Sequence, residues 1–412
     1  RYLLTLNFRA DGSSQFGPDT RWGYFPSGAV AWIITEENFM KDYSNIVSYL
    51  KLRGSVGKTG SQNLGAYDWR TLMGSATYNG AAGIVPSSLG NDILQWEEQI
   101  QKEVGLDYGF WDDRIRGTLG YYQKKVDNLL YSDPVPTSSS FSSVYQNIGS
   151  LKNRGIEFDV RVDIIKNVQK DLTWNVDFNI ARNRTTLEKL NSSDGYFGGG
   201  AYDYFKIEEG GETGRFYGYK DAGRLFMTNE ELVGLKTIDP KTGTLKYYRD
   251  DYNYERQGDV YIMDLDGDGQ ITADGDRTVI GNANPDFFGG FGSTLYWKGL
   301  MLNAVFSYSV GGDRFWDEEK NSSGDMNVYN TSNRILDSWT VNPGVNASYP
   351  RAMYYGWGSN SIITDRYIHD ASYLRMTALN LSYRLPKHLY KNSILNAVEF
   401  TFQAPNLFTW TI

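Results

Sequence analysis

The sequence has no cysteine among its 412 residues and only two histidines. Without cysteine, neither a disulfide framework nor a cysteine metal site is possible. No apolar run approaches the 18 residues that a transmembrane helix needs, but strands that cross a membrane are never continuously apolar. The formal net charge is −8, so nothing indicates a nucleic-acid-binding surface.

Aromatic residues and glycine are abundant instead. The chain contains 31 tyrosines, 11 tryptophans and 44 glycines, but only 11 prolines. This composition predicts an all-β protein with many turns and with aromatic girdles. Arg1 falls directly inside a strand-like run and no signal peptide precedes it. We therefore expect a chain that is truncated at its start.

The clearest alternating pattern lies in residues 153–183. Apolar and charged or polar residues alternate through 156–164 and again through 172–180, with a short charged turn between them. Period-two alternation predicts two strands, each about ten residues long, which is the length of a tilted strand that crosses a bilayer. The charged faces fit a water-filled lumen, with the apolar faces towards lipid. A soluble sandwich with an apolar core fits them equally well.

The lengths of the connections distinguish these two folds. About eleven strands are predicted, and short and long connections alternate between them. The short connections lie near 40–46, 110–113, 165–170, 297–299 and 386–394, and the long ones near 10–23, 58–93, 127–152, 184–286 and 310–371. This pattern favours an antiparallel transmembrane β-barrel with short periplasmic turns and long extracellular loops. Because a strand edge cannot stay open in lipid, we expect these strands to be part of a larger barrel.

A calcium-type loop is predicted within the longest connection, at residues 264–276. Carboxylates occupy its first, third and fifth positions, glycine the sixth and isoleucine the eighth, as in an EF-hand loop. The predicted ligands are Asp264, Asp266, Asp268, the backbone carbonyl of Gln270, and Asp276. Position 12 is Gly275, so the closing ligand is either Asp274 or Asp276. The alternative interpretation is an acidic turn that binds no metal. If a calcium ion is bound, its role would be structural, holding a long outer loop in place.

Candidates for ligand contact are the aromatic residues of the long connections, because exposed rings stack on sugars and peptides. They are Trp69, Tyr204, Trp316, Tyr355 and Trp357. Packing within the loops or in a girdle is the competing interpretation. No nucleophile motif is visible, and adjacent acid pairs such as Glu97 and Glu98 are interpreted as solvated charges at strand ends. The sequence therefore predicts no catalytic site.

Several longer segments resemble one family, in its order, along nearly the whole chain. They include RADGSSQFG at 9–17, RWGYFPS at 21–27, LKLRGSVGKTG at 50–60, NIGSLKNRGIE at 147–157, NPDFFGGF at 284–291 and APNLFTW at 404–410. The chain resembles the β-barrel of a SusC/RagA-type TonB-dependent transporter from the outer membrane of Bacteroidetes. The resemblance implies that 1–412 is about half of a 22-stranded barrel, with 184–286 as a long extracellular excursion.

The resemblance also implies parts and partners beyond this sequence. An N-terminal plug, a TonB-contacting segment and the final strand are expected but absent here. A SusD-like surface lipoprotein would cap the barrel, and outer-membrane lipid would surround it. The implied activity is import of oligosaccharides or peptides, driven through the TonB complex rather than by chemistry in this chain. The alternatives are a TonB-dependent siderophore or cofactor receptor and a secreted β-rich carbohydrate-binding or glycoside-hydrolysing protein.

Overall fold

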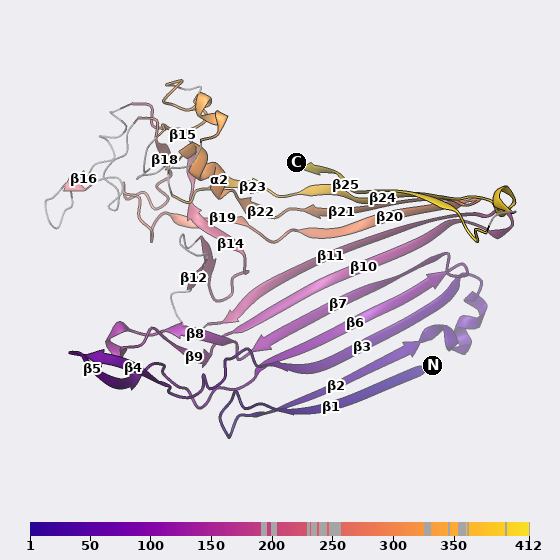
Figure 1. Cartoon of the computed structure of the whole chain (residues 1–412), viewed down its shortest axis with the longest axis horizontal. Helices are drawn as coiled ribbons and strands as arrows, with labels where there is room; N and C mark the ends of the chain where they lie inside the picture. The colour runs from indigo at the N-terminus through magenta and orange to yellow at the C-terminus, as the bar shows by residue number, and fades with distance from the viewer. Residues whose placement is uncertain are drawn as a thin grey trace.

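Eleven long strands form one antiparallel sheet in which every strand pairs with its neighbour in chain order (Figure 1). The computed structural model describes residues 1–190, 196–198, 204–228, 231, 237–238, 245–246, 257–324, 331–344, 347–352, 360, 362–391 and 394–411. The strands of the sheet are β1 (Tyr2–Gly12), β2 (Trp22–Ile33), β3 (Val47–Ser61), β6 (Glu97–Phe110), β7 (Ile115–Asp127), β10 (Ser150–Asn167), β11 (Leu172–Lys189), β20 (Phe287–Trp297), β21 (Leu300–Val310), β24 (Tyr373–Arg384) and β25 (Glu399–Thr411). The predicted number of strands and their antiparallel order are confirmed. The sheet is open, with β1 and β25 as its edges.

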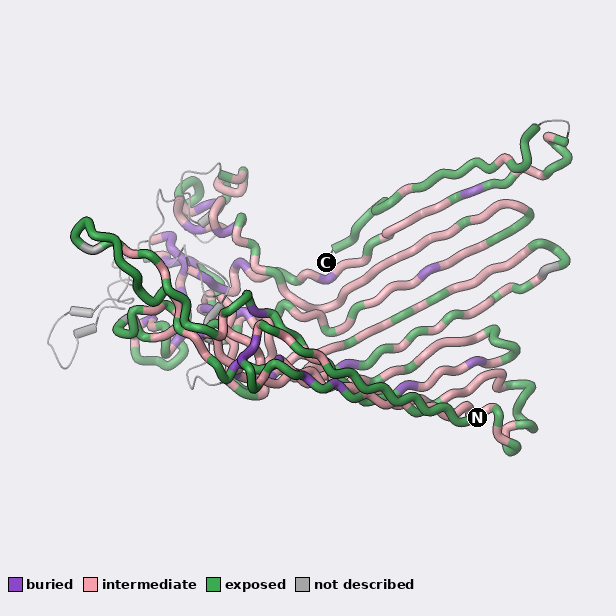
Figure 2. Tube along the Cα trace, turned by 60° about the horizontal axis from the view of Figure 1, so that its bottom comes forward, coloured by how far each residue is buried: buried purple, intermediate pink, exposed green. Residues whose placement is uncertain are grey.

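The strand register places apolar residues on one face of the sheet and polar residues on the other. One row of directly paired residues is Leu106, Leu119, Phe158 and Ile180. The adjacent row, one residue along each strand, is Asp107, Thr118, Asp159 and Asn179. We call the first face the outward face and the second the lumenal face. Fully buried residues lie mostly beyond the sheet, among the long connections (Figure 2).

The connections at the two ends of the sheet differ in length, as the sequence predicts. Short connections join the strands at one end, which we call the turn end, and long connections gather at the other, which we call the loop end (Figure 1). The tightest short turn is Lys298–Gly299, where both residues have positive φ, 48° and 86°. Glycine adopts this conformation without steric cost, which explains its place in the turn.

Small sheets occupy the long connections. Their strands are β4 (Met73–Tyr78), β5 (Ala81–Pro86), β8 (Leu130–Pro134), β9 (Ser143–Asn147), β12 (Tyr196–Gly198), β13 (Phe205–Ile207), β14 (Arg215–Tyr219), β15 (Asp221–Leu225), β16 (Thr237–Ile238), β17 (Leu245–Lys246), β18 (Val260–Ile262), β19 (Arg277–Asn282), β22 (Asp313–Phe315) and β23 (Ile368–Asp370). Antiparallel pairs join them within each connection or, for β22 and β23, across its two ends.

Helical segments are few and short. The α-helix α2 is Asp317–Glu319, and the π-helix η6 is Lys320–Gly324. The 3₁₀ segments are η1 (Ile34–Glu36), η2 (Asn38–Tyr43), η3 (Thr137–Ser139), η4 (Val168–Lys170), η7 (Asn333–Asp337), η8 (Asp365–Tyr367) and η9 (Lys387–Tyr390). In the described part of the chain, no helix has the length and apolarity needed to span a membrane.

The last strand differs from the sequence-based expectation. The sequence predicts a strand over 395–403, whereas β25 starts at Glu399 and continues to Thr411. Pro405 lacks a backbone N–H and would be expected to end the ladder. A register shift between Met376 and Ala378 of β24 lets pairing resume beyond it, and Trp410 then pairs with Leu374.

The pairing between β2 and β3 is the shortest in the sheet. It covers Ser27–Ile33 only, although both strands are longer. The next residue of β2 is Pro26, which has no N–H to donate. Beyond it an apolar cluster packs at the loop end, with Phe25 and Trp96 in edge-to-face contact at 5.6 Å. The cluster contains Phe16, Phe25, Leu64, Leu94 and Trp96.

Candidate functional site

The two longest connections, 190–286 and 311–372, pack against each other at the loop end of the sheet. We call their described residues the loop assembly. Its buried core is a cluster of Leu225, Phe226, Val260, Ile262 and Ile271 from the first connection. Trp339 and Ile362, from the second connection, pack against this cluster. The backbone N–H of Tyr219 also donates to the carbonyl of Ile363 at 2.9 Å. The two connections are therefore one packed unit.

Buried ion pairs join the same two connections. The carboxylate of Asp259 is fully buried and meets the Arg351 guanidinium at 2.6 Å and the Asn360 amide at 2.8 Å. Asp221 pairs with Arg366 at 2.7 Å. Burial raises the pKa of Asp221 above its usual value, although the Arg366 charge opposes the rise. Each pair links residues that are distant in sequence, so the assembly depends on both connections.

The predicted calcium-type loop lies in this assembly and has the expected turn geometry. One carboxylate oxygen from each of Asp264, Asp266 and Asp268 lies within 4.8 Å of the other two. Gly267 and Gly269 have φ of +77° and +83°, a conformation that glycine adopts without strain. Asp264 accepts the backbone N–H groups of both glycines, at 2.7 and 2.8 Å. Three of the predicted ligands are therefore brought together.

The carboxylates of this loop also repel one another. The backbone N–H of Asp268 lowers the pKa of Asp266, but loss of solvent contact and the charges of Asp268, Asp276 and Asp264 raise it. The net direction is upward. A divalent cation among these oxygens would remove this repulsion, which is the electrostatic argument for an ion here.

The geometry does not identify the last ligand of the calcium-type loop. Asp276 is fully buried, and its two oxygens accept the backbone N–H groups of Leu265 and Thr272, each at 2.7 Å. It lies outside the group of three clustered carboxylates. A side chain at Gly275, the twelfth position, would collide with the Asp266 carboxylate, which explains the glycine.

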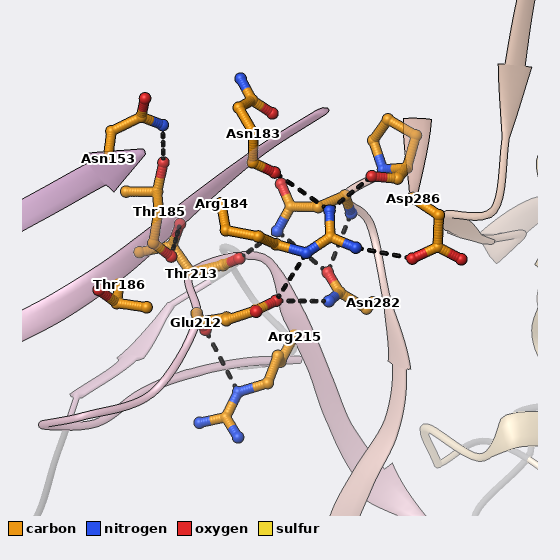
Figure 3. A network of polar contacts seen from close by, with 12 residues as sticks. Asn153, Asn183, Arg184, Thr185, Thr186, Glu212, Thr213, Arg215, Asn282 and Asp286 are labelled. Atoms are coloured by element: carbon orange, nitrogen blue, oxygen red, sulfur yellow. Dashed lines mark hydrogen bonds and ion pairs between the residues drawn. The ribbon is translucent and has the colours of Figure 1, made fainter. Parts of the chain in front are cut away.

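A polar network fixes the loop assembly to the sheet, and we call it the root network (Figure 3). Its centre is Arg184, which lies near the loop end of β11 and has a side chain that is only 13% exposed. The guanidinium donates to the carbonyl of Pro285 at 2.6 Å and to the carboxylate of Asp286 at 2.7 Å, and lies 3.6 Å from Glu212. Asn282 donates to the same Glu212 carboxylate at 3.1 Å. One side chain therefore joins the beginning and the end of the long excursion.

The root network could not be predicted from the sequence. The segment NPDFFGGF contains Pro285 and Asp286, and the sequence identifies it only by its resemblance to the family. No local pattern could have paired it with Arg184, because 102 residues separate Arg184 from Asp286.

The aromatic candidates occupy different places. Trp69 packs against the cluster around Phe25 and Trp96. Tyr204 lies against Phe315 at 5.4 Å between ring centroids. Trp316 is 41% exposed and meets His369 edge-on at 5.5 Å. These three rings are spread over the loop end and are not brought into one site. The other two predicted candidates, Tyr355 and Trp357, lie outside the described residues.

The lumenal face carries charges that pair across strands. On β3 and β6, Lys51 contacts Asp107 at 2.9 Å, and Arg53 contacts Asp107 at 3.1 Å and also Glu103. Opposite charges on facing positions stabilise neighbouring strands and leave a polar wall. Such a wall suits an aqueous lumen and would be costly against lipid.

Comparison with known proteins agrees with this architecture. Residues 1–389 match the model of the family described as TonB dependent receptor-like, beta-barrel. The chain belongs to this family. The TonB-dependent receptor barrels form a family of outer-membrane transporters rather than enzymes. In an outer-membrane barrel the apolar outward face is the one that suits contact with lipid.

The relatives of this TonB-dependent barrel are named as TonB-dependent receptors, and one of them is SusC. TonB-dependent receptor P39 of Formosa agariphila is 32% identical over 435 residues, which cover 100% of this chain and 41% of that protein. TonB-dependent receptor SusC of Bacteroides thetaiotaomicron is 32% identical over 97% of this chain and 38% of its own length.

A solved structure gives the same relationship. The RagAB peptide importer in its closed-closed state superposes with a TM-score of 0.77 at 27% identity, covering 100% of this chain and 42% of that one. The chain thus spans about two fifths of the length of the proteins it matches.

Proposed function

We propose that the protein containing this chain imports oligosaccharides or peptides through the outer membrane, driven by TonB and assisted by a SusD-like surface lipoprotein. The observation that carries the proposal is the similarity to SusC and to the RagAB peptide importer over 97% and 100% of the chain. The charged lumenal wall and the packed loop assembly support it, because a large polar cargo needs a wet passage and an outer surface that holds it.

Uptake by cells tests the transport proposal. We expect cells with the gene to take up a labelled oligosaccharide or peptide, and uptake to stop when the gene or TonB is removed. Uptake that continues without TonB would contradict the energised mechanism. Growth that depends on the gene only under iron limitation would favour a siderophore receptor instead.

Purification tests the partner. We expect the full-length protein, extracted in mild detergent, to retain a SusD-like lipoprotein at a fixed ratio. Recovery of the transporter alone, under conditions that keep its barrel folded, would contradict the partnership.

We also propose that the loop at 264–276 binds a structural Ca²⁺ ion. Asp264, Asp266 and Asp268 would hold it together with the backbone carbonyl of Gln270, because Ca²⁺ prefers six to eight oxygen ligands. The next residue, Ile271, belongs to the buried cluster of the loop assembly. Ion binding would therefore stabilise the packing of that cluster as well as the turn.

Terbium luminescence of the full-length protein tests the metal proposal. Tb³⁺ should bind and be displaced by Ca²⁺ at concentrations of about 0.1–1 mM, as for extracellular modules. Asp266→Asn should abolish the signal, whereas Asp112→Asn, in a short turn at the other end of the sheet, should preserve it. Absence of binding in millimolar Ca²⁺ would contradict the proposal. Asp274→Asn and Asp276→Asn then identify the closing ligand.

A further inference from the structure

A groove runs along the outward face of the first five strands of the sheet. Its volume is about 700 Å³, within the range of about 300–1,000 Å³ that is usual for small-molecule sites. The backbone of β2 and β3 forms its floor at Gly28 and Gly54, because neither residue has a side chain to fill it. The side chains around it are Leu4, Leu6, Val30, Val56, Val104 and Tyr121. The groove is thus apolar and faces lipid.

The groove becomes polar towards the loop end of the sheet. Lys102 and Gln123 line it there and are direct register partners on β6 and β7. Arg154 of β10 is the next residue in the same row, and the row continues on β11 with Arg184, whose charge is already paired in the root network. Arg182 of β11 lies one row towards the turn end. Lys102, Arg154 and Arg182 are exposed, and none of them has a carboxylate partner among the described residues.

The neighbouring row shows that this lack of partners is local. One step nearer the loop end, each outward-facing lysine has an acidic partner. These pairs are Lys58–Glu98 at 2.6 Å, Lys125–Asp127 at 3.0 Å and Lys152–Glu188 at 3.3 Å. On the other side of the row of Lys102 and Arg154 begin the apolar rows of the outward face, with Val104, Tyr121 and Ile156. The unpaired cations therefore lie at the boundary between apolar and charged surface.

A boundary of this kind is where lipid headgroups meet a membrane protein. Lysine and arginine side chains there extend towards the headgroups and are attracted by anionic lipid. Lys102 and Arg154 are two strands apart, roughly 10 Å, so their long side chains can reach one phosphate placed over Gln123. Arg154 can hold such a phosphate through two parallel N–H donors.

We propose that this groove is a binding site for a phosphate-bearing lipid of the outer leaflet. An acyl chain lies over Gly28 and Gly54, and the phosphate is held by Lys102 and Arg154, with the Gln123 amide between them. The site lies on the outside of the barrel wall, so it is independent of cargo, of the lumen and of the proposed transport function.

Native mass spectrometry of the full-length protein in non-ionic detergent tests the site. The probes are lipid A with its phosphates and the same lipid after dephosphorylation. The wild type should prefer the phosphorylated form. The double variant Lys102→Ala/Arg154→Ala should bind it about 30-fold more weakly, the order expected for losing two basic contacts with an anionic headgroup. The double variant Lys102→Arg/Arg154→Ala should regain part of the preference for the phosphorylated lipid.

Two further variants separate headgroup from chain. A Cβ at Gly54 would meet no atom nearer than 3.8 Å, so Gly54→Leu fills the groove without disturbing the sheet and should weaken both lipids. Lys124 is the residue after Gln123 on β7 and faces the lumen. Lys124→Ala therefore removes a positive charge from the lumenal face and should change the affinity for neither lipid. Equal affinity of the wild type for both lipids, no binding of either, or an equal loss in Lys124→Ala would overturn the proposal.

Discussion

At the scale of single residues, Arg184 joins three acceptor groups at the loop end of β11. Its guanidinium contacts a backbone carbonyl and two carboxylates that come from both ends of the long excursion. Lysine offers one compact charge and could not reach all three groups in this planar arrangement. The position therefore requires arginine for geometry as well as for charge.

Arg184→Ala should loosen the attachment of the loop assembly. Removing the cation leaves the Pro285 carbonyl without its donor and the carboxylates of Asp286 and Glu212 without their cation, at a cost of about 2 kcal/mol. Hydrogen exchange should accelerate at residues 212–215 and 282–286 of the full-length protein. Arg314→Ala, an exposed arginine of β22, is the matched control and should leave these amides protected. Unchanged protection in Arg184→Ala would show that the root network is dispensable.

Glu208 gives a pH-dependent contribution in the same assembly. Hydrogen bonds from Lys206 and Arg215 lower the pKa of Glu208 below its ordinary 4.5. A lowered pKa in the folded state means stability that is present above pH 4.5 and lost as the pH falls through the folded value. The pair is partly exposed, so its contribution is about 0.5 kcal/mol.

Unfolding of the loop assembly by urea checks this sign. Glu208→Gln should lower the midpoint at pH 7, and its difference from the wild type should shrink as the pH falls through the lowered pKa of Glu208. Glu209→Gln, its exposed neighbour without a cationic partner in the described structure, should change neither. If Glu208→Gln shifted the urea midpoint more at acidic pH than at pH 7, the predicted pH dependence would be wrong.

At the scale of elements, the loop assembly has a hydrophobic core of its own, separate from the Phe25 cluster at the loop end of β2. The side chain of Phe226 is fully buried at the centre of this core. A compact unit with a separate core can open while the sheet stays paired, because local unfolding follows the distribution of buried contacts.

Phe226→Ala should therefore destabilise the loop assembly by about 3–5 kcal/mol, the usual cost of a large buried truncation. Limited proteolysis should cleave the long connections faster, while the unboiled protein keeps the fast gel mobility of a folded barrel. Leu336→Ala removes a side chain that is 61% exposed and should have little effect. Loss of the folded mobility in Phe226→Ala would show that sheet and assembly unfold together.

The sequence predicts elements better than contacts. Period-two alternation identified the strands of the sheet because each strand has one apolar and one polar face, which is a local property. The calcium-type turn was identified for the same reason. Asp221 and Arg366 are 145 positions apart and carry no local signal of their pairing. The end of β25 is misplaced because Pro405 is expected to end a strand, whereas pairing with β24 resumes after a register shift at Asn406 and Leu407.

At the scale of the whole molecule, the decisive property is which face of the sheet meets lipid. Val176 on β11 faces outward, in the row of Val162 and Ser293, and its neighbour Asn175 faces the lumen. An arginine near the middle of the lipid-facing band costs about 2–4 kcal/mol, whereas the lumen is wet.

Val176→Arg should thus lower the urea midpoint for folding of the full-length protein into lipid vesicles, and Asn175→Arg should leave it nearly unchanged. Heat-modifiable gel mobility reports the folded fraction. The reverse order of effects would mean that the two faces have been assigned the wrong way round.

The short pairing of β2 and β3 has a mechanical consequence for the wall. Only Ser27–Ile33 of β2 is bonded to β3, while β10 and β11 are paired from Ser150 to Asn167. Strands that are pulled apart separate first where the fewest bonds share the load. Under tension on the barrel, β2 and β3 are therefore expected to separate before the other neighbouring strands of this sheet do.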